Sequence, residues 1–343
     1  MKKKICVVFT GGTIGSGTDG ATVALNTGSR KMLIDSYVKA YGKEITFDEL
    51  SPINVLSENI QPEDLKILYD CVKGIDFSAY DGIIITHGTD TLCFTVNLFG
   101  QLFCNSTVPI VFVSALYPLS DPHSNGLINF AGAVDFIEKG NLRGVYCSFA
   151  NDGENCKIHL ASRLTYPDEI NGFYHSAAGA HIAEIVDREV VINHSPLLPT
   201  PEMINTNDSE PFPFTLSSNI MLVTMRSLLL FTVYDFSKIK PQAVIVELSH
   251  SGTVCTAGDE LNFKKFADYC EECGVPLIIA PIMSRARIYD SMKELPDSVM
   301  SCFDQTMEVT LVKVMCALGA GLKADAYFER NAAFEKIYFP YNS

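Results

Sequence analysis

The chain has 343 residues, of which 47% are hydrophobic and 19% are charged, and its formal net charge is −14. A chain of this length can form two hydrophobic cores, and the composition is that of a folded globular protein. A strongly negative field repels polyphosphate chains, which argues against nucleic acid as a partner. The longest apolar runs have the length of strands and are too short to span a bilayer, which argues against an integral membrane protein.

The amino terminus and the cysteines both indicate a cytoplasmic protein. Residues 2–4 are lysines, but only a short apolar stretch follows them, whereas a signal peptide needs a longer apolar core and a cleavage site of small residues. The 11 cysteines scatter through apolar segments, as expected of small buried hydrophobes in a reducing compartment. The CxxC motif from Cys270 to Cys273 ends a predicted helix and lacks the second pair that a zinc site needs, so no metal is expected.

The first 200 residues alternate between predicted strands and predicted helices. Buried strands are predicted at 5–9, 82–86, 108–113 and 144–149, and amphipathic helices at 62–73, 91–103 and 124–139. Such alternation is typical of a mostly parallel sheet with helices on both faces. Ligands of such sheets bind beyond the carboxyl ends of the strands, which here means the loops at 10–17 and 87–91.

A change of composition divides the chain. Residues 201–217 are rich in Pro, Asn, Ser and Thr, which is typical of a linker. Beyond this segment, strands at 243–248 and 275–280 alternate with helices at 259–269 and 305–318. We therefore predict an N-terminal α/β domain at 1–200, a linker at 201–217 and a smaller C-terminal α/β domain at 218–343.

Two of the predicted strand ends carry a threonine beside a glycine. The sequence TGGTIG at 10–15 follows the first strand, and HGTDT at 87–91 follows the strand at 82–86. Backbone N–H groups at such positions can point at a bound anion. A threonine hydroxyl is a weak nucleophile until another group takes its proton. Asp90 directly follows Thr89 and is a candidate to orient that base.

These two motifs, in this order and both at strand ends, resemble the two signatures of the bacterial-type L-asparaginase/glutaminase family, in particular its cytoplasmic type I members. The sequence LSENIQPED at 56–64 lies between them and is similar to the family's loop for the substrate carboxylate. Segments at 113–118, 124–129 and 304–314 resemble further parts of the family, so the resemblance spans nearly the whole chain.

The resemblance implies catalytic roles for three residues. Thr13 would be the nucleophile that forms an acyl-enzyme, covered by a mobile flap at about residues 14–30. Thr89 and Asp90 would belong to a second set, of threonine, aspartate and lysine, which activates water or the nucleophile.

The resemblance also implies a binding site for an amino acid. Ser57 and Glu58 would hold the α-carboxylate and the α-amine of the substrate, and the charge of Glu58 suits an ammonium group. Main-chain contacts, including an oxyanion hole, would come from Gly12, Gly88 and Ala115. The implied reaction is hydrolysis of the side-chain amide of L-asparagine, or of a related small amide, to the acid and ammonia. No cofactor or metal is implied, and the family assembles as homo-oligomers, so a dimer or a homotetramer is expected.

The chain departs from the family pattern at two positions. The family's flap tyrosine has no counterpart between Gly17 and Gly28, and Tyr37 comes too late in the sequence to replace it. The family lysine aligns with Tyr166, and the nearby Lys157 is an alternative replacement. A phenol with a pKa near about 10 is a poor substitute for an ammonium group, and loss of an acid–base partner costs about 10²–10⁴ in rate.

Two other functions stay open at this point. A protein that kept the pocket but lost turnover would be a catalytically impaired amino-acid-binding protein. The related chain of a tRNA-dependent amidotransferase, an ammonia-supplying subunit, shares these motifs but carries additional sequence before the first strand.

The remaining motifs receive structural interpretations. The GxGxxG pattern at 15–20 is not followed by a helix that begins at once, so a dinucleotide site is not expected. His87 is interpreted as a satisfied histidine at a strand end. Asp304 and Glu308 are interpreted as capping residues of a helix. Four residues fit either plain surface or contact with the site of a neighbouring protomer, namely Arg285, Arg287, Tyr289 and Asp290.

Overall fold

The computed structural model of the chain describes residues 3–12, 16–19, 22–25, 28–42, 44–226, 228–249, 251–282, 289–293 and 295–339. The chain divides into two compact units: Met1–Phe214 together with Ala332–Phe334 and the end of the chain from Phe339, and Thr215–Asn331 together with Glu335–Tyr338. Within the expected linker at 201–217 the structure has the short helix α5 (Pro201–Asn205). The proposed domain boundaries, as limits of independently folding units, stay a prediction.

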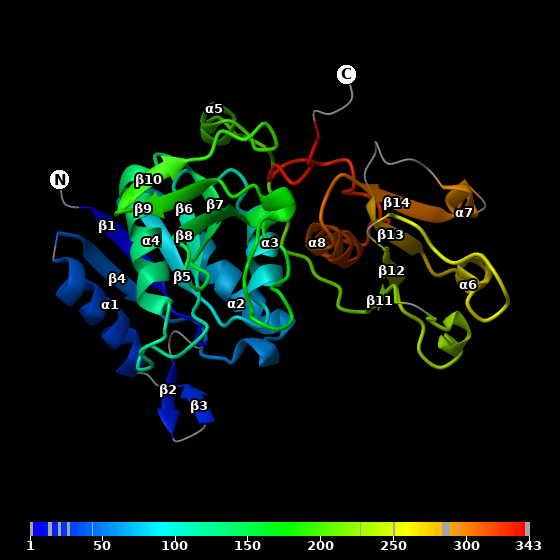
Figure 1. The fold of residues 1–343 in the computed structure, drawn as a ribbon, viewed down its shortest axis with the longest axis horizontal. Coiled ribbons are helices and arrows are strands. Elements are labelled where there is room, and N and C mark those ends of the chain that lie inside the picture. The colour runs from blue at the N-terminus through cyan, green and yellow to red at the C-terminus, as the bar shows by residue number, and fades with distance from the viewer. Residues whose placement is uncertain are drawn as a thin grey trace. The chain divides into compact units, whose positions relative to one another are not determined.

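The first unit is built on an eight-stranded sheet with the strand order β10-β9-β8-β7-β6-β5-β1-β4 (Figure 1). Its strands are β1 (Lys4–Val8), β4 (Thr46–Leu50), β5 (Gly82–Thr86), β6 (Pro109–Val113), β7 (Gly144–Phe149), β8 (Cys156–Leu160), β9 (Ala183–Val186) and β10 (Glu189–Ile192). The five strands from β4 to β7 pair in parallel, whereas β8, β9 and β10 extend the sheet as antiparallel strands. The predicted fold class is confirmed, and the antiparallel extension is an addition that the sequence did not indicate.

Helices cover both faces of this sheet. They are α1 (Gly28–Tyr41), α2 (Pro62–Lys73), α3 (Leu92–Leu102) and α4 (Gly126–Lys139), and the last three lie at or within two residues of their predicted bounds. The predicted bounds 62–73 are those of α2. The start of the helix is fixed because Pro62 occupies the first helical turn and the Gln61 backbone N–H donates to Asp64 Oδ2 at 2.9 Å.

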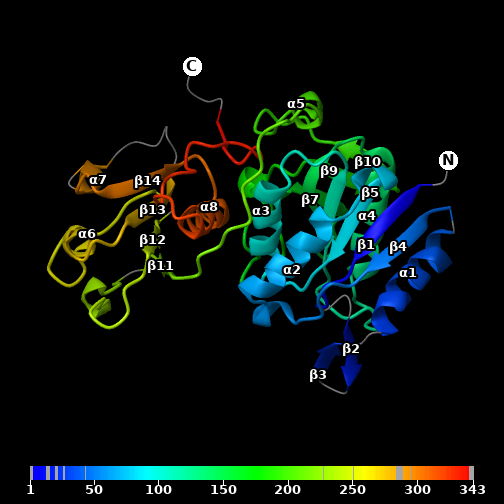
Figure 2. The same ribbon diagram turned by 180° about the vertical axis from the view of Figure 1, so that it is seen from behind.

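The crossovers through α3 and α4 have opposite hands. Consecutive residues of β6 face opposite sides of the sheet. Val111 packs in the core cluster of α1 and α4, whereas Phe112 contacts Phe99 of α3 with ring centroids 5.3 Å apart. The helices α3 and α4 therefore lie on opposite faces, as Figures 1 and 2 show from the two sides. Because the chain steps from β5 to β6 to β7 in one direction, one of these two crossovers must be left-handed, which is rare among parallel strands.

Shorter elements complete the first unit. β2 (Ser16–Asp19) and β3 (Thr22–Leu25) pair as an antiparallel hairpin, so the GxGxxG stretch does not lead into a helix. Single 3-10 turns lie at η2 (Ser57–Asn59), η3 (Phe77–Ala79), η4 (Ala161–Arg163) and η5 (Ala177–Gly179).

Residues 332–334 near the end of the chain return to the first unit. Ala332 and Ala333 form a small apolar cluster with Cys104. The carbonyls of Ala332, Ala333 and Phe334 accept hydrogen bonds from Asn207 Nδ2 at 2.9 Å, Ser162 Oγ at 2.6 Å and Arg163 Nε at 2.7 Å. Residues far apart in the sequence therefore complete the hydrogen bonding of this unit.

The second unit contains a four-stranded parallel sheet in sequential order. Its strands are β11 (Ile220–Thr224), β12 (Ala243–Glu247), β13 (Leu277–Ile282) and β14 (Val299–Phe303), and its helices are η6 (Phe231–Val233), α6 (Phe263–Glu272), α7 (Asp290–Lys293) and α8 (Met307–Gly319). Alternate residues of β12 separate two cores: Val244 and Val246 belong to the cluster of α6, whereas Ile245 belongs to that of α8. As predicted, Cys270 lies in the last turn of a helix, α6.

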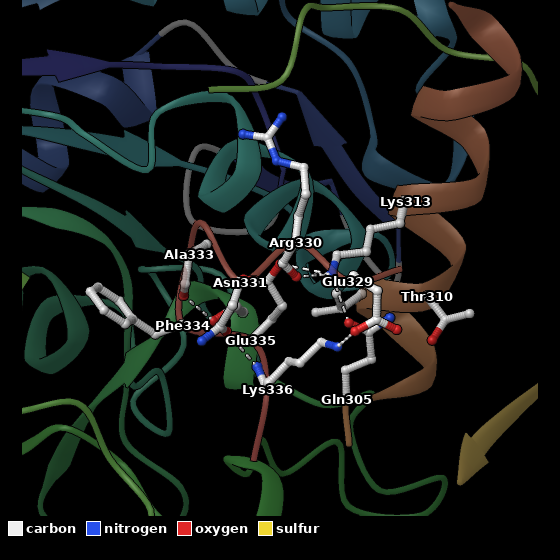
Figure 3. A network of polar contacts seen from close by, with 12 residues as sticks. Gln305, Thr310, Lys313, Glu329, Arg330, Asn331, Ala333, Phe334, Glu335 and Lys336 are labelled. Atoms are coloured by element: carbon white, nitrogen blue, oxygen red, sulfur yellow. Dashed lines mark hydrogen bonds and ion pairs between the residues drawn. The ribbon is translucent and has the colours of Figure 1, made fainter. Parts of the chain in front are cut away.

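A buried charged network joins α8 to the segment at 329–336 in the second unit (Figure 3). Lys313 Nζ and Glu335 Oε1 are 2.8 Å apart, and both side chains are 0% exposed. The same ammonium group donates to Gln305 Oε1 at 2.8 Å and to the Arg330 carbonyl at 2.6 Å. Burial lowers the pKa of Lys313, and the charge of Glu335 opposes that shift. Two hydrogen bonds and one ion pair thus hold the buried cation.

Candidate active site

The candidate site lies where two neighbouring parallel strands end. The connection after β1 leads to β4 on one side, whereas the connection after β5 leads to β6 on the other side, so the sheet has a topological switch point between β1 and β5. Open α/β sheets bind ligands at such a point, beyond the carboxyl ends of the strands. Both threonine–glycine motifs follow these two strands, at residues 10–15 and 87–91.

Glycine allows three segments to meet there at backbone distance. Gly12 has a φ of +76°, and a Cβ at this position would lie 2.3 Å from the Gly88 nitrogen. A Cβ at Gly88 would lie 2.4 Å from Ser57 Oγ. The structure therefore brings together the predicted binding residues Gly12, Ser57 and Gly88, and a larger side chain at either glycine would separate them.

The loop that carries Ser57 is fixed by hydrogen bonds to both strand ends. The Val55 N–H donates to the Thr10 carbonyl at 3.0 Å, and Thr91 Oγ1 donates to the Ser57 carbonyl at 2.9 Å. Ser57 is buried, and its Oγ donates to Asp90 Oδ2 at 3.3 Å. Glu58 follows it on the same 3-10 turn with its side chain exposed. A hydroxyl, main-chain N–H groups and two accessible carboxylates thus lie on adjoining segments.

The end of β6 supports the same edge of the sheet. Ser114 Oγ donates to the His87 carbonyl at 2.7 Å, and Asn129 Nδ2 of α4 donates to the Ser114 carbonyl at 2.8 Å. Ala115, another predicted binding residue, is completely buried directly beyond these contacts. Helix α4 thereby holds the third strand end in register with the second.

His87 is a buried neutral histidine. Its ring is enclosed, Nδ1 lies 2.8 Å from the Gly88 carbonyl, and burial lowers its pKa to about 4. At neutral pH the imidazole therefore carries no charge and donates to the carbonyl. The lowered pKa agrees with the interpretation that His87 is not a proton carrier, but the histidine is only half satisfied, because its buried Nε2 has no hydrogen-bond partner among the described residues.

Several predicted residues are not at the site or not described. Thr13 lies outside the described residues, as do Arg285 and Arg287. Tyr37 is buried in the core of α1, with its ring centroid 5.6 Å from that of Phe130, so it is no substitute for the flap tyrosine. Tyr289 is exposed.

The predicted caps of α8 need a correction. Thr306 is the N-cap, and its Oγ1 accepts from the Val309 N–H at 3.3 Å. Glu308 lies in the first turn, where a carboxylate is favourable to the helix dipole. Asp304 instead has a φ of +58°, and its carbonyl accepts from the Ile337 N–H at 2.6 Å. It therefore anchors the C-terminal segment and does not cap the helix.

The two candidates for the missing lysine, Tyr166 and Lys157, lie on different segments of the chain. Tyr166 is 62% exposed. Lys157 lies on β8, where its Nζ is 2.7 Å from Glu154 Oε2. The group that does contact the Thr89–Asp90 turn is Tyr174, whose Oη donates to the Thr89 carbonyl at 2.6 Å.

Sequence reasoning missed Tyr174, together with Thr10 and Thr91. The two threonines were inside the recognised motifs, which was a usable signal. Tyr174 lies in irregular chain between β8 and β9, where periodicity carries no information. Among the described residues no group of three His, Cys, Asp or Glu side chains is arranged to hold a metal ion. No helix in the described part of the chain is long and apolar enough to cross a membrane.

The chain is similar in sequence to amide-processing proteins. Residues 4–198 match the family model described as "Asparaginase, N-terminal". The L-asparaginase of Thermococcus kodakarensis is 27% identical over 322 residues, which cover 92% of this chain and 93% of that protein. One chain of the glutamyl-tRNA(Gln) amidotransferase of Methanococcus maripaludis is 29% identical over 161 residues, but these cover 46% of this chain and 37% of that protein.

Solved structures show the same fold. The thermostable L-asparaginase from Thermococcus kodakarensis matches with a TM-score of 0.78 at 25% identity, covering 98% of this chain and 100% of that one. L-asparaginase I from Vibrio cholerae matches with a TM-score of 0.77 at 21% identity and the same coverage, a likeness that concerns the fold alone.

Proposed function

Because the chain belongs to the asparaginase family and is a hydrolase of that family, we propose that it hydrolyses the side-chain amide of L-asparagine to L-aspartate and ammonia. The observation that carries this proposal is the convergence of Gly12, Ser57 and Gly88 at the switch point of the first sheet. Resemblance alone placed these residues in one site, and the backbone geometry independently supports that placement.

The polar groups at this edge suit a small zwitterion. Ser57 Oγ and the main-chain N–H groups of Gly12 and Gly88 are donors for an α-carboxylate. The exposed carboxylates of Glu58 and Asp90 are acceptors for an α-ammonium group. An amino acid bound this way directs its side-chain amide along the strand ends toward Thr89.

The proposed reaction is a double displacement. The Thr13 hydroxyl attacks the amide carbon, its oxygen bonds to that carbon, and the carbon–nitrogen bond breaks as ammonia leaves with the proton. Water then attacks the ester carbon, and its proton passes by way of Thr89 and Asp90 to the Thr13 oxygen as the carbon–oxygen bond of the ester breaks. Thr13 regains its hydroxyl, and aspartate is released. Main-chain N–H groups, with Ala115 and Gly88 near, would stabilise the tetrahedral oxyanion.

The amidotransferase alternative has one supporting observation, the 29% identity to one chain of such an enzyme. That similarity covers 37% of the amidotransferase chain, whereas the L-asparaginase of Thermococcus kodakarensis aligns over 93% of its length. The larger coverage of the L-asparaginase favours an amidohydrolase over an amidotransferase subunit. A cytoplasmic location and assembly into a homo-oligomer, a dimer or a homotetramer, stay predictions.

The test is ammonia release from purified protein offered L-asparagine, L-glutamine and D-asparagine. We expect release from L-asparagine, no release from Thr13→Ala, and a fall in kcat of about 10²–10⁴ for Thr89→Val or Asp90→Asn. Thr206→Val is the matched control, because this exposed threonine bonds the Glu202 carbonyl within α5. Its activity should equal that of the wild type.

Two outcomes would contradict the proposal. Retained turnover in both Thr13→Ala and Thr89→Val would exclude the threonine mechanism. A folded wild type that binds aspartate in calorimetry but releases no ammonia from any of the three amides would identify the catalytically impaired binding protein instead.

A further inference from the structure

The segment at 164–176 folds back on itself beside the site. The Thr165 N–H donates to the His175 carbonyl at 3.0 Å, and the Asp168 N–H donates to the Phe173 carbonyl at 3.0 Å. The base of this hairpin is tied to α3, because Asn97 Nδ2 donates to the Leu164 carbonyl at 3.0 Å. Two tyrosines lie on it: Tyr166 on the first arm and Tyr174 on the second.

Tyr174 is held rigidly in place. The side chain of Asn151 bonds both its backbone groups, since Nδ2 donates to the Tyr174 carbonyl at 3.0 Å and Oδ1 accepts from its N–H at 3.0 Å. The ring is completely buried and packs against Phe149 with centroids 4.7 Å apart. A side chain fixed at its backbone and at its ring has one position for its hydroxyl.

A lysine takes part in this support. Glu154 Oε2 accepts from Asn151 Nδ2 at 3.2 Å and pairs with Lys157 Nζ at 2.7 Å. The charge of Lys157 therefore orients Glu154, which orients the amide that holds Tyr174. Lys157 thus reaches the Thr89–Asp90 turn through Tyr174.

The hydroxyl of Tyr174 donates to the Thr89 carbonyl at 2.6 Å. Burial raises the pKa of this phenol, and the nearby carboxylate of Asp90 raises it further, so the group stays a neutral donor wherever the protein is folded. The next residue along the turn is held at its side chain, because Asp90 Oδ2 accepts from Ser57 Oγ at 3.3 Å.

We infer that Tyr174 is a positioning residue for amide hydrolysis, which fixes the peptide plane between Thr89 and Asp90 by its hydrogen bond to the Thr89 carbonyl. This inference rests on the proposed function. The bond sets the direction in which the Thr89 hydroxyl and the Asp90 carboxylate leave the turn. The phenol bonded to the Thr89 carbonyl comes from Tyr174.

The test compares Tyr174→Phe with a matched buried tyrosine. Tyr146 is also completely buried in the first unit, and its Oη donates to a backbone carbonyl, that of Arg143, at 2.7 Å. Both Phe variants therefore lose one buried phenol–carbonyl bond and retain the ring. We expect kcat for L-asparagine to fall about 10–100-fold in Tyr174→Phe, since a misplacement near 1 Å costs about 10² in rate. We expect kcat to stay within about twofold of wild type in Tyr146→Phe.

The split between binding and turnover identifies the role. In Tyr174→Phe, kcat should fall by a larger factor than KM or the calorimetric Kd for aspartate rises, because three of the proposed binding residues, Ser57, Glu58 and Gly88, are untouched. Asn151→Ser, which loosens the same tyrosine, should lower kcat in the same direction by a smaller factor. It also serves as the test if Tyr174→Phe does not fold.

Three results would overturn the inference. Tyr174→Phe with wild-type kcat would remove the positioning role while leaving the proposed function intact. Equal losses in Tyr174→Phe and Tyr146→Phe would reduce both bonds to general stabilisation. A wild type that releases no ammonia would refute the proposed function, and this inference with it.

Discussion

The two units bury polar groups in opposite ways. At the sheet edge of the first unit, uncharged hydroxyl groups donate to main-chain carbonyls: Thr91 to that of Ser57, and Tyr174 to that of Thr89. The carboxylate of Asp90 beside them stays exposed. In the second unit, Lys313 and Glu335 form a charged pair that is sealed from solvent.

This difference separates reactivity from stability. The ammonium group of Lys313 is enclosed by one carboxylate and two hydrogen-bond acceptors and is closed to solvent, so a ligand cannot reach it. The hydrogen bonds of Thr91 and Tyr174 in the first unit rigidify the backbone around Asp90 and leave its carboxylate accessible. Burial of charge is thus a poor guide to a site here, whereas an exposed group on a clamped turn is a good one.

The largest effect on stability is expected from breaking the buried pair. Lys313→Met leaves Glu335 buried without its cation, which should lower the free energy of unfolding by about 3–5 kcal/mol, measured by urea denaturation. Lys265→Met is the control, because Lys265 pairs with Asp259 where both side chains are exposed. It should leave the midpoint unchanged. If the two variants lose equal stability, the contrast between the networks is wrong.

A second variant separates the two effects at this network. Lys313→Met combined with Glu335→Leu removes both charges and should recover much of the loss. Because neither residue belongs to the candidate site, kcat of the folded fraction should equal that of wild type in every one of these variants.

A smaller loss of stability, with a loss of activity, is expected at the meeting point of the strands. Gly12→Ala places a methyl group 2.3 Å from the Gly88 nitrogen, whereas Gly153, with a similar φ of +73°, has nothing within 4 Å. Gly153→Ala should cost about 1–2 kcal/mol for its left-handed backbone alone. Gly12→Ala should cost about 1–3 kcal/mol more and abolish ammonia release. Similar unfolding curves for the two variants would contradict the close approach.

The smallest effect is a dependence of stability on pH, and it should come from the first unit. This unit buries bases in their neutral form: burial lowers the pKa of His87 to about 4 and that of His159 to about 3, from 6.5. The unfolded chain therefore binds protons that the folded chain does not, and stability should fall as pH decreases from 7 to 5. The slope is at most about 1.4 kcal/mol per pH unit for each histidine.

His159→Asn measures this slope directly. The variant should show a shallower decline of the urea midpoint between pH 7 and pH 5, whatever its stability at pH 7. An unchanged slope would mean that His159 takes up a proton in the folded protein.

The sequence predicted those elements whose signals are local. The start of helix α2 was placed by Pro62 and the acids after it, and the strands at 82–86 and 144–149 were apolar runs of strand length. The candidate site residues of the first sheet came from the resemblance of two motifs that each follow a predicted strand. Gly12 and Gly88 approach each other because β1 lies next to β5 in the sheet. This strand order cannot be predicted from local sequence patterns.

Groups whose role depends on distant partners could not be predicted. Lys313 lies on a helix, where a lysine normally indicates the solvent face, and only the return of the chain at 330–335 buries it. Tyr174 lies on an irregular hairpin whose position depends on Asn97 and Asn151. Both residues gain their partners from chain segments that no periodicity connects.

The contacts of residues 332–334 have a consequence for the order in which the first unit can form its hydrogen bonds during synthesis. Ser162 Oγ, Arg163 Nε and Asn207 Nδ2 belong to the first 214 residues, but their acceptors are the carbonyls of residues 332–334. During synthesis on the ribosome, these donors emerge long before the acceptors do. The first unit therefore cannot complete its hydrogen bonding while its own 214 residues are translated, and the turn that leads to the hairpin of Tyr174 acquires its final support only after residues 332–334 have been made.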